Sequence, residues 1–257
     1  MLNWRQKEII KILSEEYSVK LEFLSEKFGV SDETIRRDLK YLEEQRLLKR
    51  THGGAVLAGM RIREIPYGER EIRNRQEKRA VGRLAADFIE DGDSLVISNG
   101  TSTQEFAKAL REKKYLQVIT NSIVIANELI ANETNDVLVV GGRLRKNGMG
   151  ISGLLSVDFL EKFRVDKAIM SVGGVSLRHG ITEFHLEEAA VLRKMIEISV
   201  KKIVLADYSK LTQVGFNRVC GIDEIDVLIC DWNMPIKEQE AYRKLGIEVR
   251  LADRADF

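Results

Sequence analysis

Hydroxyl and backbone amide groups gather where a short apolar run gives way to a helical pattern. The segment Ser98–Thr103 directly follows the apolar run Ser94–Ile97. Backbone N–H groups and the dipole at a helix N-terminus favour an anion, and nearby hydroxyls add donors. A capped turn without a ligand is the alternative, because Ser and Thr are common helix caps. The residues that we predict to bind a phosphate-bearing ligand here are Asn99, Gly100, Thr101, Ser102 and Thr103.

Glycines and single basic residues follow three further apolar runs. Paired glycines allow a ligand to approach the backbone closely, and ligands of open α/β sheets lie at the carboxyl ends of strands. Lys210, just after the run Ile203–Leu205, is the predicted charged partner of the phosphate, with a surface lysine as the alternative. The further predicted contributors to this phosphate site are Gly141, Gly142, Arg145, Gly173, Gly174 and Lys210.

Positive charge is concentrated in a second region, near the N-terminus. Between Thr34 and Arg63 there are eight basic and three acidic residues, whereas residues 1–33 hold more acidic than basic residues. A local basic excess favours contact with nucleic-acid phosphates. A solvated helix face is the alternative for a basic cluster taken alone. The residues that we expect to contact DNA are Ser31, Thr34, Arg36, Arg37, Lys40, Lys49, Arg50 and His52.

Three short helices and a hairpin are predicted to position these basic residues. Apolar residues recur at helical spacing over residues 5–16 and 21–28, and Gly29 is suited to end the second helix. A third helix is expected from Asp32 to about Gln45, and residues 47–57 predict a β-hairpin wing. In a helix-turn-helix of this kind the third helix enters the major groove of DNA.

The rest of the chain alternates short β-rich runs with helical segments. This alternation predicts an α/β domain with a largely parallel sheet that helices cover on both faces. The predicted organisation is a winged helix-turn-helix domain at 1–58, a linker at 59–75 and an α/β domain at 76–257. The predicted strands of the α/β domain are Ser94–Ile97, Leu116–Thr120, Val137–Val140, Lys167–Val172, Ile203–Leu205, Val227–Cys230 and Glu248–Leu251.

Composition and residue usage argue against several other classes of protein. Apolar runs are too short to span a membrane and the N-terminus is charged from the start, so we expect a cytoplasmic protein. Cys220 and Cys230 have no neighbour at metal-ligand spacing, and the three histidines are scattered. We therefore predict no metal and no cofactor, and two buried structural thiols.

The run Thr34–Leu39 followed by the wing residues His52–Ala55 is a specific pair of motifs. Together they resemble the DeoR family of bacterial transcription regulators, and the later glycine-rich segments extend the resemblance along the chain. The resemblance implies a winged helix-turn-helix that binds double-stranded operator DNA and a sensor domain similar in fold to ribose-5-phosphate isomerase. It further implies a homo-oligomeric repressor of a sugar or carbohydrate operon, controlled by a phosphorylated metabolite. Asp38 is expected to orient the neighbouring arginines.

This sequence departs from the family pattern in the sensor domain. It has Ser98 and Gly173 where many members have acidic residues, and Glu183-Phe184-His185 where Thr-Pro-Asn is usual. These changes predict a phosphate site whose contacts to sugar hydroxyls are altered.

Two other functions stay open from the sequence. A sugar-phosphate isomerase would need a positioned general base, for which Glu183, Glu187 and Asp207 are the candidates, each without a paired partner. The other alternative is a DNA-binding regulator whose sensor domain holds no ligand and serves oligomerisation. We expect a regulator and not an enzyme.

Overall fold

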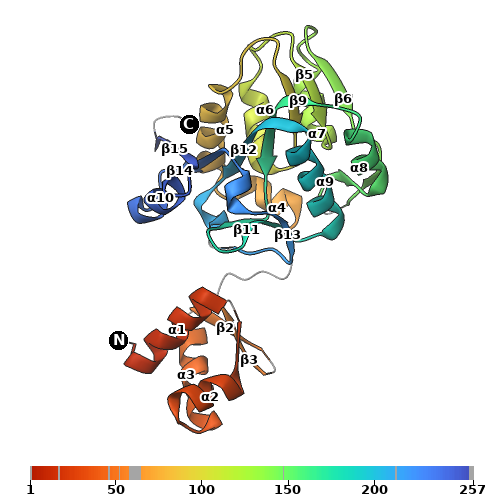
Figure 1. The fold of residues 1–257 in the computed structure, drawn as a ribbon. Coiled ribbons are helices and arrows are strands. Elements are labelled where there is room, and N and C mark those ends of the chain that lie inside the picture. Colours follow the sequence, from red (N-terminus) through yellow and green to blue (C-terminus); the bar gives the residue numbers. More distant parts are fainter. Residues whose placement is uncertain are drawn as a thin grey trace. The chain divides into compact units, whose positions relative to one another are not determined.

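The protein divides into two compact units, Met1–Arg61 and Ile62–Phe257 (Figure 1). A computed structural model describes residues 2–16, 18–45, 47–51, 53–57, 65–146, 148–211 and 213–254. Each unit has its own cluster of buried apolar side chains, as expected of a domain.

Three helices form most of the first unit: α1 (Trp4–Glu16), α2 (Leu21–Phe28) and α3 (Asp32–Glu44). Helix α2 ends as predicted at Gly29, whose φ of 62° is left-handed and favours glycine. Ser31 caps α3, because its side chain accepts a hydrogen bond from the backbone N–H of Thr34. The turn between α2 and α3 is therefore set by two adjacent capping residues.

A small antiparallel sheet completes the first unit, in the order β1 (Ser18–Lys20), β3 (Gly54–Leu57), β2 (Leu48–Thr51). Strands β2 and β3 form the predicted hairpin. Strand β1 was not predicted, and it pairs with β3 across more than thirty residues of sequence. A Cβ at Gly54 would lie 1.9 Å from the carbonyl oxygen of Val19, so only glycine lets β1 approach β3 this closely.

A seven-stranded sheet forms the centre of the second unit, with the strand order β15-β14-β12-β9-β4-β5-β6. Every pair of neighbouring strands is parallel, so the predicted parallel sheet is confirmed. The strands are β4 (Ser94–Ile97), β5 (Gln117–Thr120), β6 (Asp136–Val139), β9 (Val165–Ser171), β12 (Ser199–Ala206), β14 (Val227–Asp231) and β15 (Glu248–Ala252).

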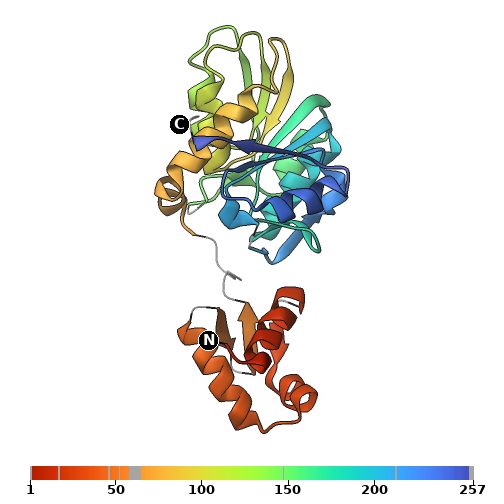
Figure 2. The same ribbon diagram turned by 90° about the vertical axis from the view of Figure 1, so that its left-hand side faces the viewer.

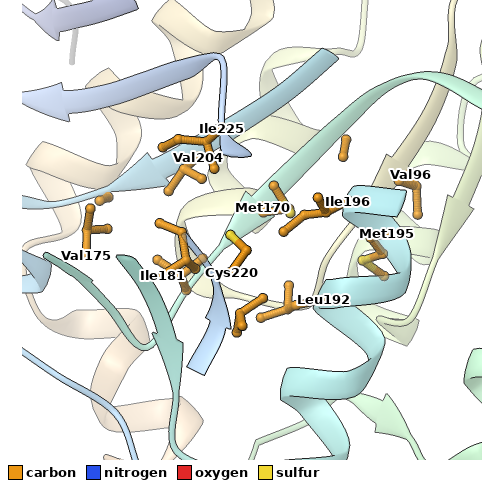
Figure 3. Packing of buried hydrophobic residues seen from close by; sticks show 14 of the residues in the cluster. Val96, Met170, Val175, Ile181, Leu192, Met195, Ile196, Val204, Cys220 and Ile225 are labelled. Carbon is orange, nitrogen blue, oxygen red and sulfur yellow. The ribbon is translucent and has the colours of Figure 1, made fainter. Parts of the chain in front are cut away.

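Helices cover both faces of this sheet (Figure 2). Side chains alternate along a strand, so Leu95 and Ile97 belong to one buried cluster and Val96 to the other. Helices α5 (Arg75–Ala86), α6 (Thr101–Ala109) and α7 (Ile123–Leu129) contribute to the first cluster. The second cluster includes residues of α8 (Leu154–Leu160), α9 (Leu186–Glu197) and α10 (Ile236–Arg243). Figure 3 shows Ile196 of α9 beside Met170 of β9 in this second cluster.

Short elements surround the carboxyl edge of the sheet. An antiparallel sheet joins β10 (Gly174–Ser176), β11 (Gly180–Glu183) and β13 (Asn217–Cys220), and β7 (Arg143–Leu144) pairs with β8 (Ile151–Ser152). Two 3₁₀ helices, Tyr208–Lys210 and Ile222–Glu224, follow β12 and β13. Cys220 and Cys230 are buried and form no disulfide. Within the ranges that the structure describes, no helix has the length and hydropathy needed to cross a membrane.

Part of the segment predicted as a linker is helical. Helix α4 (Tyr67–Ile72) lies within residues 59–75, and the Tyr67 hydroxyl donates a hydrogen bond of 2.9 Å to Oε1 of Gln104 on α6. Because Tyr67 is buried, α4 is an integral part of the second unit. The amphipathic signal of six residues is too short to be distinguished from a charged loop.

Candidate functional site

The outward face of α3 presents the predicted basic side chains. Ile35 and Leu39 are buried, whereas Arg36, Arg37 and Lys40 are exposed. The Arg37 side chain is 80% exposed, and its Nε lies 3.5 Å from the Glu33 carboxylate. An exposed ion pair of this kind contributes little to stability, so Arg37 can exchange it for a phosphate or a base edge.

Ser31 and Thr34 stand at the N-terminus of α3 and organise it. Their hydroxyl oxygens lie 3.0 Å apart, and Ser31 also accepts from the Thr34 N–H. Ser31 is exposed and Thr34 is partly exposed. Both hydroxyls therefore lie where the N-terminal end of a recognition helix meets base edges and phosphates.

The wing is tied to α3 through Arg50. Its Nε donates to the Glu43 carboxylate at 2.6 Å and its backbone N–H donates to the same carboxylate at 2.8 Å. The side-chain and backbone hydrogen bonds from Arg50 hold the pKa of Glu43 below its ordinary value. Arg50 thus positions the wing, while Lys49 is exposed. His52 lies outside the described residues.

Asp38 does not orient its neighbouring arginines, contrary to the expectation. It is buried and accepts hydrogen bonds from Nε of Arg5 at 2.5 Å and from Nε2 of Gln6 at 2.9 Å. Both donors belong to α1, so the acidic residue of the motif joins α1 to α3. The sequence did not reveal this contact, because the partners are more than thirty residues apart.

The loop that follows β4 lies at the carboxyl edge of the parallel sheet, next to the end of β9. The Ser98 hydroxyl accepts from the backbone N–H of Ser171 at 2.9 Å. A Cβ at Gly100 would lie 2.2 Å from the Cβ of Ser171, so glycine is required for this approach. The chain continues from β4 to β5 on one side and from β9 to β12 on the other. Open α/β sheets bind ligands at such a reversal of the strand order.

Asn99 provides an acceptor at this position. Its backbone N–H donates to Oδ1 of Asn121 at 2.7 Å, and its Nδ2 donates to the carbonyl of Gly148 at 2.8 Å. Its own Oδ1 is buried and accepts no hydrogen bond from the described residues. A buried acceptor without a donor is costly, so a ligand hydroxyl that donates to it would stabilise the loop.

The hydroxyl residues of the loop have unequal roles. Thr101, Ser102 and Thr103 are all buried at the start of α6. The Thr103 hydroxyl donates to the carbonyls of Ser98 and Gly100, at 2.7 and 3.1 Å, and so stabilises the turn itself. The Thr103 hydroxyl proton is thus used within the turn, and a ligand contact at Thr103 stays a prediction.

The structure places Gly141 and Gly142 beside α8 and β8. Gly142 has a φ of 146°, and a Cβ there would lie 2.4 Å from the Ser156 hydroxyl, while the Gly141 carbonyl accepts from that hydroxyl. Arg145 forms an ion pair with Glu188 of α9. Asn99 of the β4 loop donates a hydrogen bond to Gly148, which lies three residues after Arg145. Arg145 is therefore closer in sequence than Gly141 or Gly142 to a residue that contacts this loop.

A carboxylate that sequence analysis left outside the site lies next to Gly173. A Cβ at Gly173 would lie 3.0 Å from Oε1 of Glu183, which extends from β11 and is buried. Glu183 therefore occupies the space that an acidic side chain at position 173 would need. Gly174 in turn lies against the carbonyl of Gln213, where a Cβ would approach to 2.1 Å.

A buried lysine accompanies Lys210 at the end of β12. Lys78 of α5 is buried, and its Nζ donates to the backbone carbonyls of Arg70 and Arg73 at the end of α4. Burial lowers the pKa of Lys78 to about 8, against an opposing contribution from the Asp207 carboxylate, and Lys210 contributes to the lowering. Lys78 was not among the predicted site residues, because only the packing of α4 distinguishes it from the exposed basic residues of α5.

Asp207 joins α5 to the strand end that carries Lys210. Its carboxylate accepts from Nδ2 of Asn74 at 2.8 Å and from the backbone N–H of Ser209 at 3.2 Å. Asn74 has a left-handed φ of 49°, a conformation that asparagine tolerates better than most residues. The buried carboxylate of Asp207 thus caps the 3₁₀ helix that carries Lys210.

Lys78→Met is expected to flatten the dependence of stability on alkaline pH. The pKa of Lys78 is about 8 in the folded protein and about 10.5 when solvated, so the unfolded chain binds more protons between these values. The free energy of unfolding should therefore rise with pH from 8 to 10.5, by at most about 3 kcal/mol from this residue. Urea unfolding of both proteins across this range measures the difference, and parallel pH profiles would contradict it.

A cavity of about 420 Å³ adjoins the loop region on the side of α4. Its lining includes Tyr67, Gln104, Lys146 and Met149. Two larger hollows, of about 600 and 650 Å³, lie along α5 and α6 and between α6 and α7. None of these three hollows is lined by a residue predicted to bind the effector.

Comparison with known proteins assigns both units of the chain. Residues 5–60 match the family model of the DeoR-like helix-turn-helix domain, and residues 73–232 match that of the DeoR C-terminal sensor domain. The chain belongs to the DeoR family. This is a family of DNA-binding transcription regulators and not of enzymes, which argues against the isomerase alternative. The DeoR-type domains imply DNA and a small-molecule effector as partners.

Several DeoR-type repressors are similar to this chain over most of their length. The HTH-type transcriptional repressor GlcR of Bacillus subtilis is 38% identical over 87% of this chain and 86% of its own. The transcriptional repressor AccR of Agrobacterium fabrum is 35% identical over 88% of each chain. The glycerol-3-phosphate regulon repressor of Escherichia coli is 32% identical over 96% of this DeoR-family chain and 98% of its own.

Among solved structures, the DeoR-family chain has a distant similarity to ribose 5-phosphate isomerase A from Methanocaldococcus jannaschii. The identity is 16%, the TM-score is 0.40, and the match covers 54% of this chain and 55% of that one.

Proposed function

We propose that this protein represses an operon for the use of a sugar or related carbohydrate, and that a phosphorylated metabolite controls its binding to double-stranded operator DNA. The exposed basic face of α3, together with the wing that Arg50 joins to it, carries the DNA-binding part of the proposal. The relatives named as repressors support the direction of regulation. Such a regulator works in the cytoplasm, where operator DNA lies.

Arg37→Ala is expected to weaken operator binding by about 1–3 kcal/mol if Arg37 contacts a base edge, and by somewhat less if it contacts a phosphate. Arg37 is suited to either contact because its side chain is 80% exposed. Binding is measured by fluorescence anisotropy at fixed salt, with DNA from upstream of the protein's own gene. Lys244→Ala, which removes an exposed charge of the second unit, is the control. Equal affinities for wild type and Arg37→Ala would exclude Arg37 from the DNA interface.

The effector site that we propose lies at the carboxyl ends of β4, β9 and β12. Backbone N–H groups at the start of α6 and the ammonium group of Lys210 supply phosphate donors, and Oδ1 of Asn99 supplies an acceptor for a hydroxyl. Glu183, beside Gly173, is the carboxylate that we propose for further hydroxyl contacts. A relative named for glycerol-3-phosphate supports an organic phosphate as the effector class.

A thermal-shift screen tests this effector site, because a ligand of the folded state raises the unfolding temperature. Sugar phosphates, glycerol phosphate and their unphosphorylated counterparts form the panel. A shift confined to phosphorylated compounds supports the proposal. The absence of any shift would favour a sensor domain that serves oligomerisation alone.

We also propose that the protein acts as a homo-oligomer. Leu144, Leu154 and Leu155 are exposed large apolar side chains on β7 and α8, at 47, 76 and 70% exposure. Leu154 and Leu155 are adjacent on α8, and clustered exposed apolar side chains are typical of protein interfaces. Operators read by symmetric dimers contain two half-sites. Sedimentation velocity on the full chain measures the assembly.

A further inference from the structure

Helices α5 and α6 pack against each other at very short range. A Cβ at Gly82 of α5 would lie 2.6 Å from the backbone nitrogen of Phe106 and 2.7 Å from the carbonyl carbon of Glu105, both on α6. Glycine therefore permits a contact of backbone with backbone. This contact fixes the side chains on the outer surfaces of the two helices relative to one another.

A basic groove of about 600 Å³ lies along these two helices. Arg75, Arg79, Arg83, Lys108 and Arg111 line it. Glu105 is the acidic residue among the described lining residues, and its carboxylate is already within 2.8 Å of Nζ of Lys108. The four arginines are exposed. The groove thus carries a clear positive excess in a chain whose net charge is only +1.

The arginines of α5 are spaced to meet an extended anion. Arg75, Arg79 and Arg83 are four residues apart, so they share one helix face and span about 12 Å. Like charges at this spacing repel one another and destabilise the helix. An anion that lies along the face would remove that repulsion.

The character of the groove points to phosphates of a polymer. Arginine presents a planar fork that matches a phosphate group, and four of the five basic residues are arginines. Protein interfaces have an apolar or aromatic centre, whereas Ala109 is the apolar residue among those that line this groove. Small ligands are usually enclosed by mostly apolar walls, which an open groove between helices does not provide.

We propose that the α5–α6 groove is a second DNA-binding surface, which holds the phosphate backbone of duplex DNA without reading its sequence. This proposal rests on the proposed function as an operator-binding protein. The recognition helix α3 would then supply sequence preference, while the groove adds a salt-dependent affinity that is equal for all sequences.

The test compares the salt dependence of DNA binding by the full chain and by the variant R75Q/R79Q/R111Q. Each phosphate contact contributes about 0.9 to the slope of log affinity against log salt concentration. The slope should become less negative by about 2 to 3, on a long operator fragment and on random duplex DNA alike. The variant K162Q/K237Q/K244Q removes three exposed charges elsewhere in the same unit and should keep the wild-type slope.

The proposal would be overturned if R75Q/R79Q/R111Q kept the wild-type slopes and affinities. It would also be overturned if this variant lost binding to inorganic polyphosphate but bound DNA as wild type does. Thermal unfolding checks that the variant is folded, and relief of repulsion should leave its melting temperature equal to or above that of wild type. The proposed function has a separate readout. If wild type fails to prefer the operator over random DNA, that function fails, whereas a changed slope on random DNA still supports the groove.

Discussion

Gly100→Ala is expected to abolish the response to the effector while operator affinity without effector stays at the wild-type level. The new Cβ would lie 2.2 Å from Cβ and 2.5 Å from Oγ of Ser171, distances that no side-chain rotation at position 100 can relieve. The turn between β4 and α6 must move, at an overpacking cost of about 1–3 kcal/mol. Backbone N–H groups in the first turn of α6 would then no longer converge on the point where we propose that the phosphate binds.

Operator release by a phosphorylated compound found in the thermal-shift screen measures this effect. Gly68→Ala, an exposed change on α4, is a matched control, because a Cβ at Gly68 meets nothing within 4 Å. Adding Ser171→Gly to Gly100→Ala removes the colliding side chain and should restore the response, since Ser98 contacts only the backbone of Ser171. Wild-type release by Gly100→Ala would show that the effector binds elsewhere.

Asp38→Ala is expected to destabilise the first unit enough to abolish operator binding. Asp38 is 5% exposed, and its loss would leave the Arg5 guanidinium and the Gln6 amide, both of α1, without their acceptor. Removing one partner of a buried ion pair costs about 3–5 kcal/mol, and partial exposure of Arg5 reduces this to about 2–4 kcal/mol. Small domains have little more stability than that.

Amide hydrogen exchange of the full chain separates this loss from a direct effect on DNA contacts. Peptides from α1 and α3 should lose protection in Asp38→Ala, while peptides from the parallel sheet keep it. Asp38→Asn retains one acceptor oxygen and should be intermediate, and Glu44→Ala, an exposed change on the same helix, should exchange like wild type. Full protection in Asp38→Ala with weakened binding would instead assign Asp38 to the DNA interface.

The sequence predicted the central sheet well because buried parallel strands form continuous apolar runs. All seven predicted runs overlap the seven observed strands. Strand β1 was missed, since Ser18-Val19-Lys20 has no periodic pattern and becomes a strand only by pairing with residues 54–56. Helix α4 was missed because six residues carry too little pattern.

The sequence predicted where the loops of the candidate site lie, but not the contacts that depend on packing. The Ser98–Thr103 loop and Lys210 do follow strands at one edge of the sheet. The sequence does not distinguish Lys78 from Arg79, because only the backbone carbonyls at the end of α4 set Lys78 apart. It also does not show that the Thr103 hydroxyl donates to the carbonyl of Ser98, because that contact depends on the conformation of the turn. Glu183 lies beside position 173 only because β11 folds back to pair with β10, which directly follows Gly173, and no local pattern indicates this pairing.

The strand order also determines when this protein can sense its effector during synthesis. Strands β4, β5 and β6 lie on one side of β9, and β12, β14 and β15, which leave the ribosome later, lie on the other. Pairing between such distant segments is slow compared with the local packing of three short helices. The nascent chain is therefore expected to complete its helix-turn-helix first, and the loop of β4 and Lys210 come to the same edge of the sheet only after β12 has joined it.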